Sequence, residues 1–151
     1  MNYWLIKTEP GTFSIDDLKK ADVEPWDGIR NYQARNFMRD DMKVGDKVLI
    51  YHSVVNPPHV AGLAEVASTP YPDHTQFNPA SKYYDSKSTQ ESPRWILVDM
   101  KFIAKATQIL SLTDIKNDPK LEGIRVAQKG ARLSIMPISK DHYNYIAKKI
   151  S

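Results

Sequence analysis

Two strand-like segments on either side of Asn56-Pro57-Pro58 place the first limit on the fold of this chain. Residues 47–53, Lys-Val-Leu-Ile-Tyr-His-Ser, form the clearest strand pattern in the sequence. Residues 59–67 have a similar character, so the two segments predict an antiparallel pair. Small residues at Ala61, Gly62 and Ala64 indicate that another part of the chain packs close to this backbone.

Further short strands and helices are predicted on both sides of this pair. Residues 3–7 and 94–103 are typical of buried strands, the second of them long and central. Side chains able to cap a helix start precede four helical patterns, at Ser14, Asn31, Ser111 and Ser139. Residues 130–135 indicate a turn or short strand. Non-adjacent strands with short helices between them predict an α+β fold, either a small mixed barrel or a curved sheet.

The stretch 68–93 has little regular pattern but holds four prolines and four aromatic residues. Irregular stretches of this length inside a compact domain are usually functional or disordered. The aromatic residues favour an ordered loop that lies across the body of the domain.

The size and charge of the chain limit its class. Its 151 residues suit a single domain, 1–151, with a sizeable core. The net charge is only +3, but residues 101–151 carry ten Lys and Arg against four Asp and Glu. Such a basic third could contact a polyanion such as nucleic acid, or could simply be a solvated lysine-rich face.

Several features favour a soluble intracellular protein. The sequence contains no cysteine, which excludes disulfides, thiolate chemistry and cysteine-based zinc sites. No apolar run approaches the ~18 residues of a membrane span, and the first residues lack a signal-peptide layout. We therefore expect no membrane association.

The stretch 25–36, Pro-Trp-Asp-Gly-Ile-Arg-Asn-Tyr-Gln-Ala-Arg-Asn, is the best candidate for a functional site. It combines large aromatics, arginines and amide side chains between apolar segments. A pocket that stacks a flat ring and hydrogen-bonds its edges needs such a mixture. The structural alternative is a loop that leads into a capped helix, with Trp26 anchored in the core.

Catalytic and metal signatures are weak. His52 and Ser53, with Asp85 or Asp99, could suggest a base and a nucleophile, but neighbours in a strand point to opposite faces. The four histidines lack metal-ligand spacing, and no phosphate-binding glycine loop is present. We therefore expect no cofactor, no metal and no catalytic residue.

Cations and aromatics elsewhere in the chain could complete a pocket. Lys7 and Arg94 sit beside strong strand patterns, where they could hold a phosphate or simply reach solvent. Trp26 with His52, Ser53 and Tyr84 would make a slot of the size of a nucleobase, if the fold brings them together.

The order of the motifs resembles the EVE domain family. The matching segments are Tyr3-Trp4-Leu5-Ile6-Lys7-Thr8-Glu9-Pro10, Phe13-Ser14, Trp26-Asp27-Gly28-Ile29-Arg30-Asn31-Tyr32-Gln33-Ala34-Arg35-Asn36, Tyr51-His52-Ser53, Tyr83-Tyr84-Asp85, Pro93-Arg94-Trp95 and Val98-Asp99. They cover about residues 3–147 in order, and the Trp-Asp-Gly-Ile-Arg-Asn-Tyr-Gln-Ala-Arg-Asn string is highly specific.

The resemblance implies a PUA-like fold, a small pseudo-β-barrel with flanking short helices, and a pocket that takes in a modified base. The same superfamily includes YTH readers of methylated adenine in RNA and SRA readers of methylated cytosine in DNA. By motif position, the implied pocket residues are Trp26, Arg30, Asn31, Tyr32, His52, Ser53 and Tyr84, and the implied phosphate contacts are Lys7, Arg35 and Arg94. Val54 and His59 depart from the family pattern at the expected pocket rim, where Asn and Gly are usual.

The leading hypothesis is a non-enzymatic reader of a modified base, such as methylated or hydroxymethylated cytosine or a modified RNA base. Its partner would be DNA or RNA, and we expect a monomer that is cytoplasmic if bacterial and nuclear if eukaryotic. Two alternatives stay open: a nucleotide-directed hydrolase or nuclease that uses His52 or Asp85, and a protein-interaction module.

Overall fold

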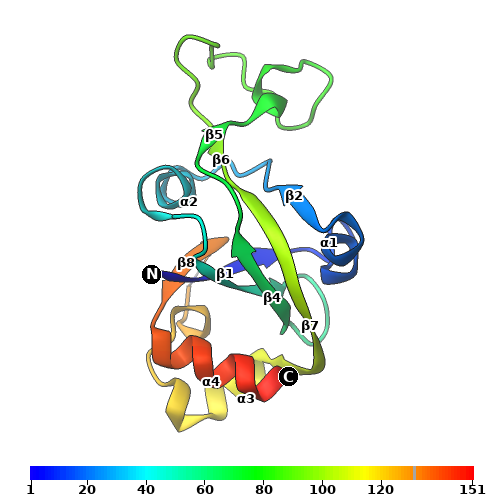
Figure 1. Cartoon of the computed structure of the whole chain (residues 1–151), viewed down its shortest axis with the longest axis vertical. Coiled ribbons are helices and arrows are strands. Elements are labelled where there is room, and N and C mark those ends of the chain that lie inside the picture. Colours follow the sequence, from blue (N-terminus) through cyan, green and yellow to red (C-terminus); the bar gives the residue numbers. More distant parts are fainter. Residues whose placement is uncertain (131) are drawn as a thin grey trace.

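A six-stranded sheet forms the body of the molecule (Figure 1). The computed structural model describes residues 1–130 and 132–151. In spatial order the strands are β2 (Val23–Pro25), β7 (Asp99–Ser111), β4 (His59–Val66), β3 (Lys47–His52), β1 (Tyr3–Thr8) and β8 (Ile135–Ile138). The predicted antiparallel pair is confirmed as β3 and β4, while β1 pairs with β3 in parallel. A separate ribbon joins β5 (Tyr71–Pro72) to β6 (Ile96–Leu97).

Short helices pack around the sheet at the predicted places. The α-helices of the described residues are α1 (Ile15–Ala21), α2 (Tyr32–Asn36), α3 (Leu112–Asn117) and α4 (Lys140–Ile150). A π-helix, Phe37–Asp41, continues α2, and single 3₁₀ turns occupy His74–Phe77, Pro119–Leu121 and Arg125–Ala127. The four predicted caps are confirmed, because each of their side chains accepts a backbone hydrogen bond from the first turn of its helix. Within residues 1–130 and 132–151, no helix has both the length and the apolar character needed to cross a membrane.

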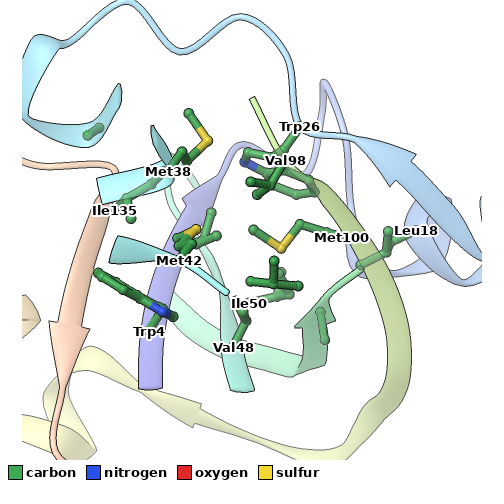
Figure 2. Close-up of a cluster of buried hydrophobic side chains, with 14 of the residues drawn as sticks. Trp4, Leu18, Trp26, Met38, Met42, Val48, Ile50, Val98, Met100 and Ile135 are labelled. Atoms are coloured by element: carbon green, nitrogen blue, oxygen red, sulfur yellow. The ribbon is translucent and has the colours of Figure 1, made fainter. Parts of the chain in front are cut away.

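The central strands are buried on both faces, so alternate side chains enter two different cores. Trp4 and Ile6 of β1 point into one core with Trp26, as Figure 2 shows for the two tryptophans, and Leu5 enters the other. Helices α1 and α2 contribute to the first core, while α3 and α4 contribute to the second. This layering explains why the strand segments read as nearly continuous apolar runs.

Gly62 confirms the predicted close approach to β4. A β-carbon at this position would lie 2.5 Å from the carbonyl oxygen of Ala104 and 2.6 Å from the side chain of Ile15. Only glycine lets β7 and the first turn of α1 come this near to the strand.

The strand predicted over 94–103 is wrong in its bounds and its position. The chain leaves the ribbon after β6, and Val98 uses its carbonyl oxygen to accept a hydrogen bond from the backbone of Trp26. Strand β7 then continues as far as Ser111 and lies next to the edge strand β2 rather than at the centre of the sheet. Of the turn or strand expected over 130–135, Gly130 lies in a turn and Ile135 begins β8, while Ala131 lies outside the described residues.

Residues 73–95, which we call the arm, project from the end of the molecule opposite α3 and α4 (Figure 1). The arm is ordered, as predicted, but it does not lie across the body. Its centre is the fully buried Gln76, whose amide nitrogen donates to the carbonyls of Asp73 and Trp95. The amide oxygen of Gln76 accepts from the backbone of Trp95 and from the hydroxyl of Ser88. Polar contacts therefore hold this irregular stretch together.

Candidate functional site

An open cleft of about 490 Å³ lies where three segments of the chain meet. These segments are the end of β1 with the loop after it, β2 with the turn after it, and the arm. The lining residues are Lys7, Thr8, Glu9, Thr12, Phe13, Glu24, Pro25, Trp26, Asp27, Gly28, Ile29, Lys82 and Tyr83. The stretch 25–36 singled out from the sequence thus supplies only residues 25–29 to the cleft.

Trp26 lies at the bottom of the cleft and belongs mainly to the core. Its side chain is only 7% exposed and packs beside Val98 and Met100 (Figure 2). The ring of Phe13, which also lines the cleft, meets the indole edge-on at a centroid distance of 5.7 Å. Both sequence interpretations of Trp26 therefore describe part of its environment, since it is anchored in the core and also borders an opening.

Tyr83 forms a wall of the cleft from the arm. Its ring lies against the backbone of Gly28, where a β-carbon would stand 2.6 Å from a ring carbon. Gly28 also has a φ of +80°, which side-chain-bearing residues rarely adopt. The ammonium of Lys82 lies 5.0 Å from the centre of the ring. Glycine at position 28 is therefore required both by backbone conformation and by the nearness of this ring.

Arg30 holds the arm to the turn after β2, and it does not line the cleft. Its guanidinium donates to the carbonyl oxygen of Tyr83 at 2.7 and 3.0 Å and pairs with Asp73 at 3.1 Å. Asp73 is only 1% exposed. Burial alone would raise the pKa of Asp73, but hydrogen bonds from Thr75, Gly28 and Arg30 hold that pKa below its ordinary value. The arginine fixes the position of Tyr83 through these contacts.

Three other predicted residues near Arg30 also have structural partners. Asn31 caps α2 through a hydrogen bond from the backbone of Ala34. Tyr32 stacks on Trp95 at 4.8 Å, and the guanidinium of Arg35 lies 4.7 Å from the centre of the Tyr32 ring. Neither Tyr32 nor Arg35 lines the cleft.

His52 and Ser53 lie at the end of β3, outside the cleft lining. The buried His52 ring accepts a hydrogen bond through Nε2 from the backbone of Ile15, at 3.1 Å. Burial lowers the pKa of His52, and the nearby His59 lowers it further. Ser53 donates its backbone N–H to the carbonyl of Thr8. His59 and the exposed Val54, the two departures from the family pattern, do not line the cleft either.

The catalytic pairing of His52 with Asp85 receives no support from these contacts. The carboxylate of Asp85 accepts hydrogen bonds from the indole of Trp95 and the backbone of Lys87 within the arm. Hydrogen bonds from Trp95 and Lys87 lower the pKa of Asp85. Both candidate groups therefore have structural roles, and neither borders the cleft.

Lys7 is the predicted cation that lines the cleft, and partial burial lowers its pKa. Arg94 and Tyr84 do not line it. The carbonyl of Arg94 accepts from Arg35, and its N–H donates to Ser88. Of the ten residues predicted from the sequence, the cleft brings together Trp26 and Lys7.

Sequence reasoning missed the aromatic residues Phe13 and Tyr83 and the carboxylates of the cleft. Phe13 belongs to one of the motifs that resemble the EVE family, and Tyr83 directly precedes Tyr84, which the resemblance assigns to the pocket. Local spacing does not show which of two neighbouring tyrosines turns toward another segment.

Charge around the cleft is mixed rather than basic. The cleft lining contains the cations Lys7 and Lys82 and three carboxylates, which belong to Glu9, Glu24 and Asp27. No lining residue follows Tyr83, and α3 and α4 of the basic last third lie at the opposite end of the molecule (Figure 1). Among the residues that the structure describes, no group of three or more metal-ligating side chains could hold an ion.

The sequence profile of the EVE domain matches residues 2–149. The chain belongs to the EVE domain family. Thymocyte nuclear protein 1 of Mus musculus is 35% identical to this EVE domain over 164 residues, which cover 96% of this chain and 72% of the mouse protein.

Solved structures of other EVE proteins share the fold. A protein from Pseudomonas syringae is 41% identical, with a TM-score of 0.93 and 99% of each chain covered. Human thymocyte nuclear protein 1, in complex with DNA that contains 5-methylcytosine, is 34% identical, with a TM-score of 0.90 and coverage of 100% of this chain and 98% of the human chain. These matches confirm the predicted PUA-like α+β fold for this EVE domain.

Proposed function

We propose that this protein binds DNA that contains 5-methylcytosine and holds the modified base in the cleft. The observation that carries the proposal is the human relative, whose structure in complex with such DNA matches 100% of this chain. The cleft at the end of β1 offers this chain a place for one base, because its volume of about 490 Å³ is typical of small-molecule sites.

The cleft has the chemistry that an extruded base needs. A base that leaves the duplex loses a few kcal/mol of stacking and pairing, which contacts in the protein must offset. Stacking on an aromatic side chain contributes ~1–3 kcal/mol per base. We expect Tyr83, which lines the cleft, to supply this contact, and Trp26 and Phe13 to form the apolar floor for the methyl group.

Phosphate contacts would come from cations beside the cleft. Lys7 and Lys82 both line it and can approach the backbone of the strand that carries the extruded base. Each such contact releases counterions, so we expect the affinity for DNA to fall as the salt concentration rises.

The direct test is to measure binding of matched oligonucleotides by fluorescence anisotropy. Duplexes with 5-methylcytosine, 5-hydroxymethylcytosine or cytosine at one position, and the corresponding RNAs, would be compared at fixed salt. One methyl group in an apolar pocket changes affinity by only ~10–200-fold, so we expect a preference for 5-methylcytosine within that range. Equal affinity for methylated and unmethylated DNA would reject the proposal.

A tyrosine pair provides the matched variants for this test. Tyr83→Ala removes the proposed stacking wall, while Tyr84→Ala removes a neighbouring ring that is 44% exposed and does not line the cleft. We expect Tyr83→Ala to weaken binding of methylated DNA by about 1–3 kcal/mol and Tyr84→Ala to have little effect. The same mixtures, followed by gel electrophoresis, report any cleavage of the DNA.

A further inference from the structure

Two carboxylates stand beside the aromatic floor of the cleft. Glu24 lies in β2, opposite Met100 of β7, and Asp27 follows Trp26 directly. The N–H of Asp27 bonds to the carbonyl of Pro25, so the chain bends sharply around the tryptophan. Both carboxylates line the cleft.

These two carboxylates differ from the other acidic groups near the arm and β7. Asp73 pairs with Arg30, Asp85 accepts from Trp95, and Asp99 accepts from the hydroxyl of Tyr71. Within residues 1–130 and 132–151, by contrast, no other residue forms a side-chain hydrogen bond or an ion pair with Glu24 or Asp27. Their oxygens are available to a ligand in the cleft.

The surroundings of the two groups favour a ligand that donates hydrogen bonds. Burial raises the pKa of Glu24, and the neighbouring Asp27 and Asp99 raise it further. Burial also raises the pKa of Asp27 and Asp73 raises it further, which outweighs the lowering effects of Arg30 and of the Asp27 backbone N–H. Negative charge is thus crowded here, and an N–H group that enters the cleft would relieve it.

We infer that Glu24 and Asp27 read the exocyclic amine of the base and make the cleft specific for 5-methylcytosine over thymine. This inference rests on the proposed function. Both bases carry the same methyl group at C5, so the apolar floor formed by Trp26 and Phe13 does not distinguish them. They differ at C4, where cytosine has an amine that donates to a carboxylate and thymine has a carbonyl oxygen that a carboxylate repels.

The distinction matters chemically because hydrolytic loss of the amine converts 5-methylcytosine into thymine. A reader that recognised only the methyl group would bind the deaminated product as well. Carboxylates at the amine position reject that product, since an acceptor facing an acceptor leaves both without a partner. A good contact to a base edge corresponds to roughly 5- to 150-fold discrimination.

The test compares three bases placed opposite an abasic spacer, so that no base pair contributes to the difference. The bases are 5-methylcytosine, thymine and 5-methyl-2-pyrimidinone, which keeps the methyl group but has hydrogen in place of the amine. For the wild-type protein we expect an affinity at least about fivefold higher for 5-methylcytosine than for either of the other two.

The variants are Glu24→Gln, Asp27→Asn and the double variant, each of which keeps the shape of the side chain. The control is Glu122→Gln, which removes the same charge at an exposed position outside the cleft. We expect the ratio of affinities for 5-methylcytosine and thymine to fall toward one in the double variant and to stay unchanged in the control. Circular dichroism spectra and unfolding curves would confirm that each variant folds.

Two results would overturn the inference. One is a wild-type protein that binds 5-methylcytosine and thymine equally well, and the other is a ratio that survives in the double variant. In either case a preference for 5-methylcytosine over cytosine would leave the proposed function intact. Absence of that preference in the wild type would overturn the proposed function, and the inference with it.

Discussion

The ring of Tyr83 rests so closely on the backbone of Gly28 that a methyl group added there would overlap three ring atoms, at 2.6 to 2.9 Å. The contact joins the arm to the turn after β2 and sets the distance between two sides of the cleft. A change in one of these segments should therefore alter the other through this contact.

Replacement of Gly28 by alanine should both destabilise the fold and weaken binding. A side chain at a φ of +80° is strained by about 1–3 kcal/mol, and displacement of Tyr83 adds to that cost. The matched control is Gly123→Ala, which has a φ of +83° but no atom within 4 Å of its new β-carbon. Urea unfolding should show the larger loss for Gly28→Ala; equal losses would mean that Tyr83 moves away freely.

The contacts of Arg30 with Asp73 and with the carbonyl oxygen of Tyr83 should contribute more to stability than an ion pair on the surface. Replacement of Arg30 by methionine leaves the buried Asp73 without its cation, and we expect a loss of about 2–4 kcal/mol. Arg39→Met provides the comparison, since Arg39 and Asp40 form an exposed pair at 2.8 Å, where we expect a much smaller loss because water screens the charges. Chemical denaturation measures both. Similar losses for the two variants would contradict the structural role of Arg30.

Trp26 should behave as a core residue in stability measurements. Truncation of its 7% exposed side chain to alanine leaves a large cavity beside Val98 and Met100, so we expect a loss of about 3–5 kcal/mol. Trp26→Phe should cost less because it keeps part of the packing. A loss below about 1 kcal/mol for Trp26→Ala, measured by urea unfolding, would mean that the indole is not packed in the core.

The stability of the protein should fall as the pH is lowered from about 7 toward 5. His52 accepts a hydrogen bond from Ile15 in its neutral form, and burial, together with His59, lowers its pKa in the folded state. Below the ordinary histidine pKa the unfolded chain therefore binds more protons than the folded chain. The contribution of His52 to the free energy of unfolding is complete above the pKa of this residue in the unfolded chain. It is lost as the pH falls through the lower pKa of His52 in the folded protein.

His52→Gln tests this pH dependence, because an amide oxygen can accept from Ile15 but does not titrate. The free energy of unfolding would be measured in urea at pH 7.5 and at pH 5.5 for both proteins. We expect the decrease to be larger for the wild type than for His52→Gln. An equal decrease would assign the effect to other groups.

Elements of the fold could be predicted from the sequence where interactions between neighbouring residues determine them. Ser14, Asn31, Ser111 and Ser139 cap the helices that follow them, because a cap depends only on residues within one turn. Strand β2 was missed because its three residues are too few to show a periodic pattern. Its pairing with β7 depends on contacts between segments some 75 residues apart in the sequence.

The cleft could be predicted only in part, because its walls come from distant segments. Trp26 and Lys7 were found through motif positions, whereas Tyr83 depends on the path of the whole arm. The position of Arg30 in the motif predicts a pocket residue but does not reveal its partners. In the structure Asp73 and the carbonyl oxygen of Tyr83 engage its guanidinium.

Hydrogen bonds around the buried Gln76 hold the arm together, and Arg30 joins the arm to the turn after β2. A small polar assembly of this kind can detach by local opening at a lower free energy than the sheet needs to unfold. The arm, which forms one wall of the cleft, should therefore open locally before the sheet unfolds. On warming, the protein should lose its affinity for a ligand while its strands are still paired.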